Sequence, residues 1–303
     1  MYGMKKKFAL DLNAWILIGM TFFASFFFNL VFLLFSWNLD RIVWIKMILL
    51  CVGLVHLLVF RRRNANVIRY ACLLIAITGL NLVNGWIGST GWFLSVFPQS
   101  SFFGSVGANI SLKWFNVLVL IALLLAFYRK PSAVGLVPGD LRVKAAKIPW
   151  LGIPDNWVSW GRLSWVSGIL ISLGTILLTF VTVIGTISTW NFALYARLLP
   201  LVIGFAVLNS FAEGMMFRNS VISPLETTAP KEFVILLAAA FFGSFHYYGA
   251  PGGILGVLMA GLLGWFMGRC YYETKGFLAP WIIHFFQDFV VFSTLVLLGG
   301  FVS

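Results

Sequence analysis

The chain has 303 residues, of which 61% are hydrophobic and only 10% are charged. A soluble domain of this length needs far more polar surface, so the composition excludes a soluble globule and predicts an integral membrane protein. The 21 Lys and Arg outnumber the 9 Asp and Glu. They lie in short segments between apolar runs, as topology signals do, and so predict no nucleic-acid partner.

Nine apolar runs are each long enough to cross about 30 Å of hydrocarbon, which takes about 20 residues. Because only helices and closed barrels can satisfy their backbone in lipid, runs of this length predict helices. We therefore expect an all-α, polytopic membrane fold with about nine transmembrane helices. The runs lie near residues 14–37, 43–60, 67–88, 112–128, 162–187, 192–221, 232–248, 253–271 and 277–300.

Basic residues mark every second connection between these runs, whereas the long connection from Asn81 to Ser111 carries none. Short cytosolic loops are enriched in Lys and Arg. We therefore expect a cytosolic N-terminus and an outside C-terminus, in the plasma membrane. The basic residues of these connections are Lys5, Lys6, Lys7, Arg61, Arg62, Arg63, Arg129, Lys130, Arg142, Lys144, Lys147, Arg218, Lys231, Arg269 and Lys275.

The largest basic connection, at about 129–161, divides the chain into two parts. It mixes Arg and Lys with three Trp and several Pro and Gly, a composition suited to an anionic headgroup surface, so membrane lipid is an expected partner. Four runs precede it, and five runs follow it and hold every candidate catalytic residue. We expect an N-terminal scaffold module at 1–160, which could bind partner membrane proteins through its four spans, and a functional core at 161–303.

The predicted span at 253–271 has small residues at every fourth position. Such spacing lets neighbouring helix backbones approach closely in lipid. It predicts a tightly packed central helix in preference to a dimerisation face. The small residues are Gly252, Gly256, Ala260, Gly264 and Gly268.

Two acids and two histidines lie inside apolar runs of the second half. Glu213 is in the sixth run, His246 is near the end of the seventh, and His284 and Asp288 are in the ninth. An ionisable side chain at bilayer depth costs about 2.5 kcal/mol or more, so such residues usually face a polar cavity and have a function there. Because His284 and Asp288 are four residues apart, they share one helical face, where the acid can orient the imidazole.

These residue types are the parts of a peptide hydrolase. Glu213 can act as a general base that activates water, and His246 can share the proton or hold the water. His284 and Asp288 can stabilise an oxyanion through N–H and O–H donors. At about 1.5 Å per residue, however, Glu213 and His246 lie about 12 Å and about 21 Å from the cytosolic ends of their predicted spans. A tilt or a kink must close that gap, and we expect it at Gly243 or Pro224.

Three short motifs carry a family resemblance: Glu-x-x-x-x-Arg at Glu213–Arg218, Phe-x-x-x-His at Phe242–His246, and His-x-x-x-Asp at His284–Asp288. In this order, on three core helices, they resemble the CPBP family of intramembrane glutamic proteases. That family includes Rce1-type CAAX prenyl endopeptidases and bacteriocin-processing relatives. The resemblance covers roughly residues 195–300.

The resemblance implies an intramembrane endopeptidase that needs no metal or other cofactor and cleaves a membrane-associated protein or peptide. By resemblance, Glu213 and His246 activate the water, while His284 and Asp288 form the oxyanion site. Arg218 and Phe242, the remaining motif residues, support them.

One departure from the family pattern is Gly214, because the family usually has a second glutamate directly after the first. Arg218 therefore loses its habitual partner, and the charge of the pocket falls by one. This departure leaves a non-enzyme alternative open: a catalytically degenerate CPBP-like membrane scaffold that binds partner proteins.

Two further alternatives are a zinc hydrolase and a proton-coupled transporter. Two histidines and a glutamate form a ligand set that zinc accepts, although the sequence has no His-Glu-x-x-His motif. A transporter would be expected to repeat the motif-bearing spans in the first half, which it does not.

Overall fold

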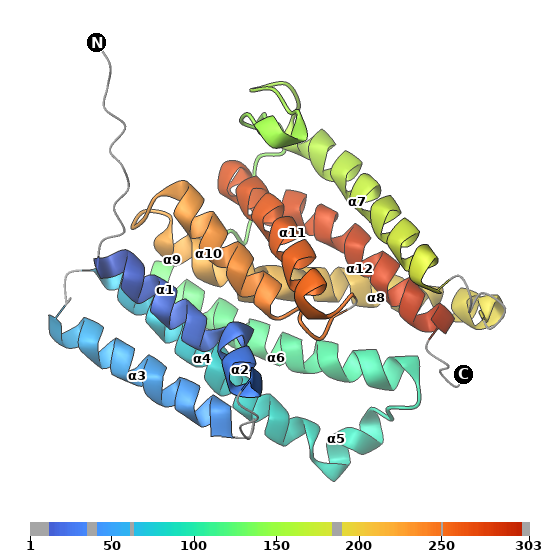
Figure 1. Ribbon diagram of the computed structural model, residues 1–303, viewed down its shortest axis with the longest axis horizontal. Helices are drawn as coiled ribbons and strands as arrows, with labels where there is room; N and C mark the ends of the chain where they lie inside the picture. The colour runs from blue at the N-terminus through green and yellow to red at the C-terminus, as the bar shows by residue number, and fades with distance from the viewer. Residues whose placement is uncertain (1–11, 35–40, 61–63, 184–189, 250, 299–303) are drawn as a thin grey trace.

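A computed structural model describes residues 12–34, 41–60, 64–183, 190–249 and 251–298. This part of the chain is helical and contains no β-strand, which confirms the predicted all-α class (Figure 1). The elements are α1 (Leu12–Ala24), α2 (Phe26–Leu34), α3 (Ile42–Phe60), α4 (Ala65–Gly88), α5 (Gly91–Val96), α6 (Phe102–Tyr128), η2 (Pro131–Val134), η3 (Pro149–Leu151), α7 (Trp160–Val183), α8 (Phe192–Glu213), η5 (Gly214–Asn219), α9 (Ser220–Leu225), α10 (Lys231–Ser244), α11 (Gly253–Thr274) and α12 (Leu278–Leu298).

Seven helical segments among the described residues are long and apolar enough to cross a membrane. The polytopic membrane class is therefore confirmed, but the predicted count of about nine is not. The run expected near 232–248 is the 14-residue α10, too short for a full span at about 1.5 Å per residue. The seven segments are Ile42–Val59, Ala65–Gly88, Phe102–Tyr128, Trp160–Phe180, Phe192–Leu225, Gly253–Thr274 and Leu278–Leu298.

The first predicted run is divided at Ser25 into α1 and α2. The Ser25 hydroxyl donates to the Phe22 carbonyl at 2.8 Å and accepts from the Phe27 N–H at 3.2 Å, so it competes with regular helical hydrogen bonds. The Lys46 ammonium donates to the Ser25 carbonyl at 2.7 Å. These side-chain bonds satisfy the backbone where the helix is interrupted.

The two halves of the described chain pack against each other. Helix α6 packs on α8, and α4 packs on α9, while α12 lies between α7, α8 and α11. One buried hydrophobic cluster contains Leu50, Leu74 and Leu120 from the first half and Met215 and Ile283 from the second. The core therefore crosses the predicted boundary near residue 160, and the division into 1–160 and 161–303 stays a prediction.

The basic connection after α6 is folded onto the ends of α10 and α11. The Glu273 carboxylate accepts from the Trp160 indole N–H at 2.8 Å, from the Ala146 N–H at 3.1 Å and from the Lys231 ammonium at 2.7 Å. Trp150 remains exposed, as expected of a residue at a membrane interface. Contact of this connection with lipid headgroups stays a prediction.

The small residues of α11 pack closely against α10. A Cβ atom added to Gly264 would lie 2.9 Å from the Phe242 ring, and one added to Gly243 would lie 2.7 Å from the Val257 carbonyl oxygen. The prediction of a tightly packed helix is confirmed. Gly243 permits this close helix crossing, whereas a tilt or kink at this residue stays a prediction.

The basic groups at Lys5–Lys7 and Arg61–Arg63, on which the predicted orientation partly depends, lie outside the described residues. The protein is an integral membrane protein. The orientation of its termini and its location in the plasma membrane stay predictions.

Candidate functional site

The backbone changes its hydrogen-bonding pattern directly after Glu213. Residues Gly214–Asn219 form the π-helix η5, and all six are buried. The Ser220 hydroxyl donates to the Met216 carbonyl, and Pro224 has no N–H to donate to the turn before it. Such π segments often occur at functional sites. The helical segment then continues through α9 to Leu225, so Glu213 lies about 18 Å from its end, not about 12 Å as expected. This depth is close to the depth of about 21 Å expected for His246, so the longer helix accounts for most of the expected difference in depth.

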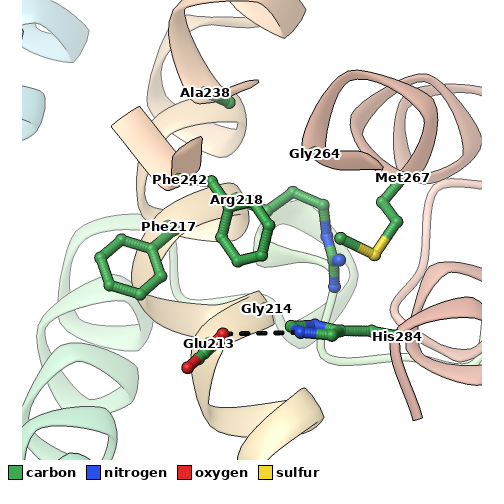
Figure 2. Close-up of a pocket in the computed structure, with 9 residues that line it drawn as sticks. All are labelled: Glu213, Gly214, Phe217, Arg218, Ala238, Phe242, Gly264, Met267 and His284. Carbon is green, nitrogen blue, oxygen red and sulfur yellow. Dashed lines mark ion pairs between the residues drawn. The ribbon is translucent and has the colours of Figure 1, made fainter. Parts of the chain in front are cut away.

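Glu213 lies at the centre of the site. Its side chain is 8% exposed, and its Oε1 atom accepts from the Lys113 ammonium at 2.5 Å. Its Oε2 atom lies 3.5 Å from His284 Nε2 and 3.9 Å from His246 Nε2. Oε2 has no hydrogen-bond partner among the described residues. The structure therefore brings the three predicted residues together and leaves one carboxylate oxygen facing both imidazoles. Figure 2 shows the contact of Glu213 with His284.

His246 lies in the turn after α10 and is held by Phe242, one helical turn earlier. Its Nδ1 atom is 3.0 Å from the Phe242 carbonyl oxygen. Because a carbonyl only accepts, Nδ1 carries the proton, and in a neutral ring Nε2 is left as an acceptor. The Phe242 ring lies 4.4 Å from the His246 ring and meets the His284 ring edge-on at 5.4 Å. Phe242 therefore orients both histidines.

Asp288 belongs to the same polar cluster as Glu213. Its Oδ1 atom lies 3.5 Å from His284 Nε2, and its Oδ2 atom accepts from the Asn209 amide at 3.0 Å. The Asn209 carbonyl oxygen in turn accepts from the Lys113 ammonium at 2.7 Å. The hydrogen bonds of Lys113 and Asn209 thus fix the two carboxylates relative to one another, and His284 Nε2 lies between them at 3.5 Å from each.

Sequence reasoning missed Lys113 and Asn209. Asn209 precedes Glu213 by four residues on α8, so its shared helical face was a usable signal. Lys113 was hidden because the run was expected to begin at 112, which placed this lysine at a membrane edge. Helix α6 begins ten residues earlier, at Phe102, and carries Lys113 into its interior. The first half of the chain therefore supplies a residue to the site, which the expected separation of functions did not include.

Arg218 lines the same cavity from the π-helix. It is 6% exposed, and no carboxylate of a described residue lies within ion-pair distance of it. Its guanidinium lies beside Gly214 and near His284 and Met267 (Figure 2). The cavity is lined by Glu213, Gly214, Phe217, Arg218, Ala238, Phe242, Gly264, Met267 and His284.

The described His, Cys, Asp and Glu side chains form no group of three placed to hold one metal ion. Glu213 and the two histidines face one another, but Lys113 already occupies one carboxylate oxygen. This arrangement gives the zinc alternative no ready ligand set among these residues.

Comparison with protein families bears on the region that contains this site. Residues 195–290 match the family described as type II CAAX prenyl endopeptidase, Rce1-like. This region is similar to that family. The match confirms the resemblance drawn from the three motifs, and it spans all four predicted site residues, Glu213, His246, His284 and Asp288. Lys113 lies outside the Rce1-like region. No curated protein and no solved structure matches the chain.

Proposed function

We propose that the protein is an intramembrane endopeptidase that cleaves a membrane-associated protein or peptide with a water activated by Glu213. The Rce1-like region indicates a CAAX-type intramembrane protease. The observation that carries the mechanism is the free Oε2 atom of Glu213, which faces His284 Nε2 at 3.5 Å and His246 Nε2 at 3.9 Å.

The first step is activation of water between Glu213 and His246. Glu213 Oε2 and the unprotonated His246 Nε2 are both acceptors, and their 3.9 Å separation is too long for a direct hydrogen bond. One water can donate a hydrogen to each and turn a lone pair toward the substrate. Glu213 takes one proton as the water oxygen attacks the carbonyl carbon of the peptide bond.

The second step is stabilisation of the tetrahedral oxyanion by His284. The Nε2 atom of His284 is 3.5 Å from both Glu213 Oε2 and Asp288 Oδ1, so an N–H here lies between two carboxylates without a short bond to either. It remains available to an oxyanion. The proton on Glu213 then passes to the leaving nitrogen, the C–N bond breaks, and a carboxylic acid and an amine result.

Lys113 supports this cycle from the other side of the carboxylate. Its ammonium bonds to Oε1 at 2.5 Å, which neutralises Glu213 in the apolar interior and leaves Oε2 as the reactive oxygen. Asn209 hydrogen-bonds to both Lys113 and Asp288 and so fixes the position of Asp288 relative to the Lys113–Glu213 pair.

The test uses purified protein in liposomes with two candidate substrates, a farnesylated peptide ending in a CAAX sequence and an acylated peptide without that ending. We expect the native protein and the exposed-site control Lys130→Gln to cleave at least one of them, with EDTA present or absent. Glu213→Gln is expected to lose cleavage by about 100-fold or more, as removal of a general base does. Equal cleavage by Glu213→Gln contradicts the proposal.

Gly214 is the observation that favours the catalytically silent scaffold. That reading predicts that Glu213→Gln leaves the biological activity of the protein intact, whereas disruption of the 129–161 connection abolishes it. The protease reading predicts loss of activity with Glu213→Gln while the protein is still folded in the membrane.

A further inference from the structure

Arg218 is a buried cation that the mechanism above does not use. It is 6% exposed, and its Nε atom has no hydrogen-bond partner among the described residues. Its guanidinium carbon lies 5.5 Å from the centre of the Tyr271 ring. Burial of a charge without an opposite charge is strongly destabilising, so such a residue normally has a partner and a function.

Acids on the segments that surround Arg218 are already engaged. Glu213 bonds to Lys113 through Oε1 and faces two histidines through Oε2. Glu273, on the same helix as Tyr271, bonds to Lys231 at 2.7 Å. Asp288 accepts from the Asn209 amide, and no carboxylate of a described residue lies within ion-pair distance of Arg218. The guanidinium therefore has no acidic partner among these residues.

The position next to the guanidinium is occupied by a residue without a side chain. A Cβ atom on Gly214 would lie 2.5 Å from Arg218 Nη2 and 3.2 Å from Cζ. The guanidinium therefore rests against bare backbone, and the chain itself places no carboxylate there. Apart from Glu213 and His284, the rest of the lining is apolar, with Phe217, Ala238, Phe242, Gly264 and Met267. An apolar wall strengthens the attraction between the cation and an incoming anion.

We propose that Arg218 binds a carboxylate of the substrate, beside the bond that Glu213 and His284 act on. A planar guanidinium matches a carboxylate with two parallel hydrogen bonds, a geometry that a lysine cannot offer. The substrate class is then a peptide whose terminal or side-chain carboxylate lies close to the cleaved bond. The identity of the ligand as a peptide rests on the proposed function, whereas binding of a carboxylate at Arg218 does not.

The first test measures carboxylate binding without any cleavage. Thermal unfolding of the detergent-purified protein is followed in sodium formate and in sodium chloride at equal ionic strength. We expect formate to raise the melting temperature of the native protein saturably by about 2 °C or more. Arg218→Met is expected to show no formate-specific rise. An equal response of native protein and Arg218→Met, or no response in the native protein, overturns the proposal.

Two substitutions at Gly214 test the same site without replacing Arg218. Gly214→Glu places a carboxylate next to the guanidinium, while Gly214→Gln has nearly the same size and no charge. We expect Gly214→Glu to melt at a higher temperature than Gly214→Gln and to be insensitive to formate. If the two variants melt alike and formate stabilises both equally, the position beside Arg218 is not an anion site.

The second test separates this inference from the proposed function. Two lipid-anchored peptides are compared, identical except for a free carboxylate or an amide at the carboxyl end. We expect the native protein to cleave the free acid with at least a tenfold lower KM, and Arg218→Gln to lose most of that preference. Equal KM values for both peptides overturn the carboxylate subsite and leave the protease intact. Cleavage of neither peptide together with a positive formate response contradicts the protease and leaves the anion site.

Discussion

Replacement of Lys113 by methionine tests whether the first half of the chain sustains the site. Lys113 makes two charge-assisted hydrogen bonds, at 2.5 Å to Glu213 and at 2.7 Å to Asn209. Each such bond contributes about 1.5–3 kcal/mol. The side chain of Lys113 is 24% exposed, so water already solvates part of its charge and the net contribution of its bonds is smaller. The side chain of Glu213 is only 8% exposed, so removal of Lys113 leaves a buried carboxylate charge without a partner. We expect a loss of about 3 kcal/mol in the free energy of unfolding.

The assay is a double-mutant cycle with Lys113→Met and Glu213→Gln, measured by reversible unfolding in mixed micelles. Because either substitution removes the same ion pair, the two losses are expected to be non-additive by about 2 kcal/mol. Lys130→Met, at an exposed lysine, is the control and is expected to change stability by less than about 0.5 kcal/mol. Additive losses within about 0.5 kcal/mol refute the assigned role of Lys113.

Three further predictions follow from other contacts. Gly243→Ala should destabilise the protein by about 2 kcal/mol, because the new Cβ lies 2.7 Å from the Val257 carbonyl oxygen. The control Gly261→Ala should be tolerated, because its new Cβ lies 3.8 Å from the nearest atom. Equal melting temperatures of the two variants contradict the packing argument. Asn209→Leu should lower kcat about tenfold or more with little change in KM, because Asp288 loses its 3.0 Å hydrogen bond while the cavity wall is unchanged. A change confined to KM indicates that Asn209 contributes to substrate binding instead. Treatment with EDTA should leave peptide cleavage unchanged, and restoration of a lost activity by added zinc points to the metal alternative.

The four candidate site residues could be selected from the sequence because their chemistry restricts the residue type and their positions are unusual. An acid and two histidines within apolar spans have few structural uses, and the i, i+4 spacing of His284 and Asp288 depends only on the helical repeat. Their convergence is visible in the structure through Glu213 Oε2, which faces both imidazoles.

Lys113 could not be predicted from local pattern, because 100 residues separate it from Glu213 along the chain. The two meet only because α6 packs on α8, and the sequence of one span does not reveal which helix will be its neighbour. The start of α6 was also obscured, since the polar residues Ser101, Ser105 and Asn109 precede the strongly apolar part of the run. Ser101 caps the helix by accepting from the Gly104 N–H at 2.9 Å.

The π-helix after Glu213 could not be predicted from the sequence either. The six residues Gly214–Asn219 are all buried, and their composition carries no signal that separates a π-helix from an α-helix. The break at Ser25 similarly depends on Lys46, which reaches it from α3. Hydrophobicity defined the existence of the helices, whereas side chains from distant helices defined where they are interrupted.

The most direct test of the central claim is to compare the termini of membrane-associated peptides in cells that carry the native protein, Glu213→Gln, or no protein. A chelator-treated sample of the native cells is measured alongside, and the membrane abundance of both forms is matched. Hydrolysis by Glu213-activated water predicts a cleavage product that disappears with both the substitution and the deletion and persists under chelation. A product that depends on the protein but persists with Glu213→Gln contradicts it.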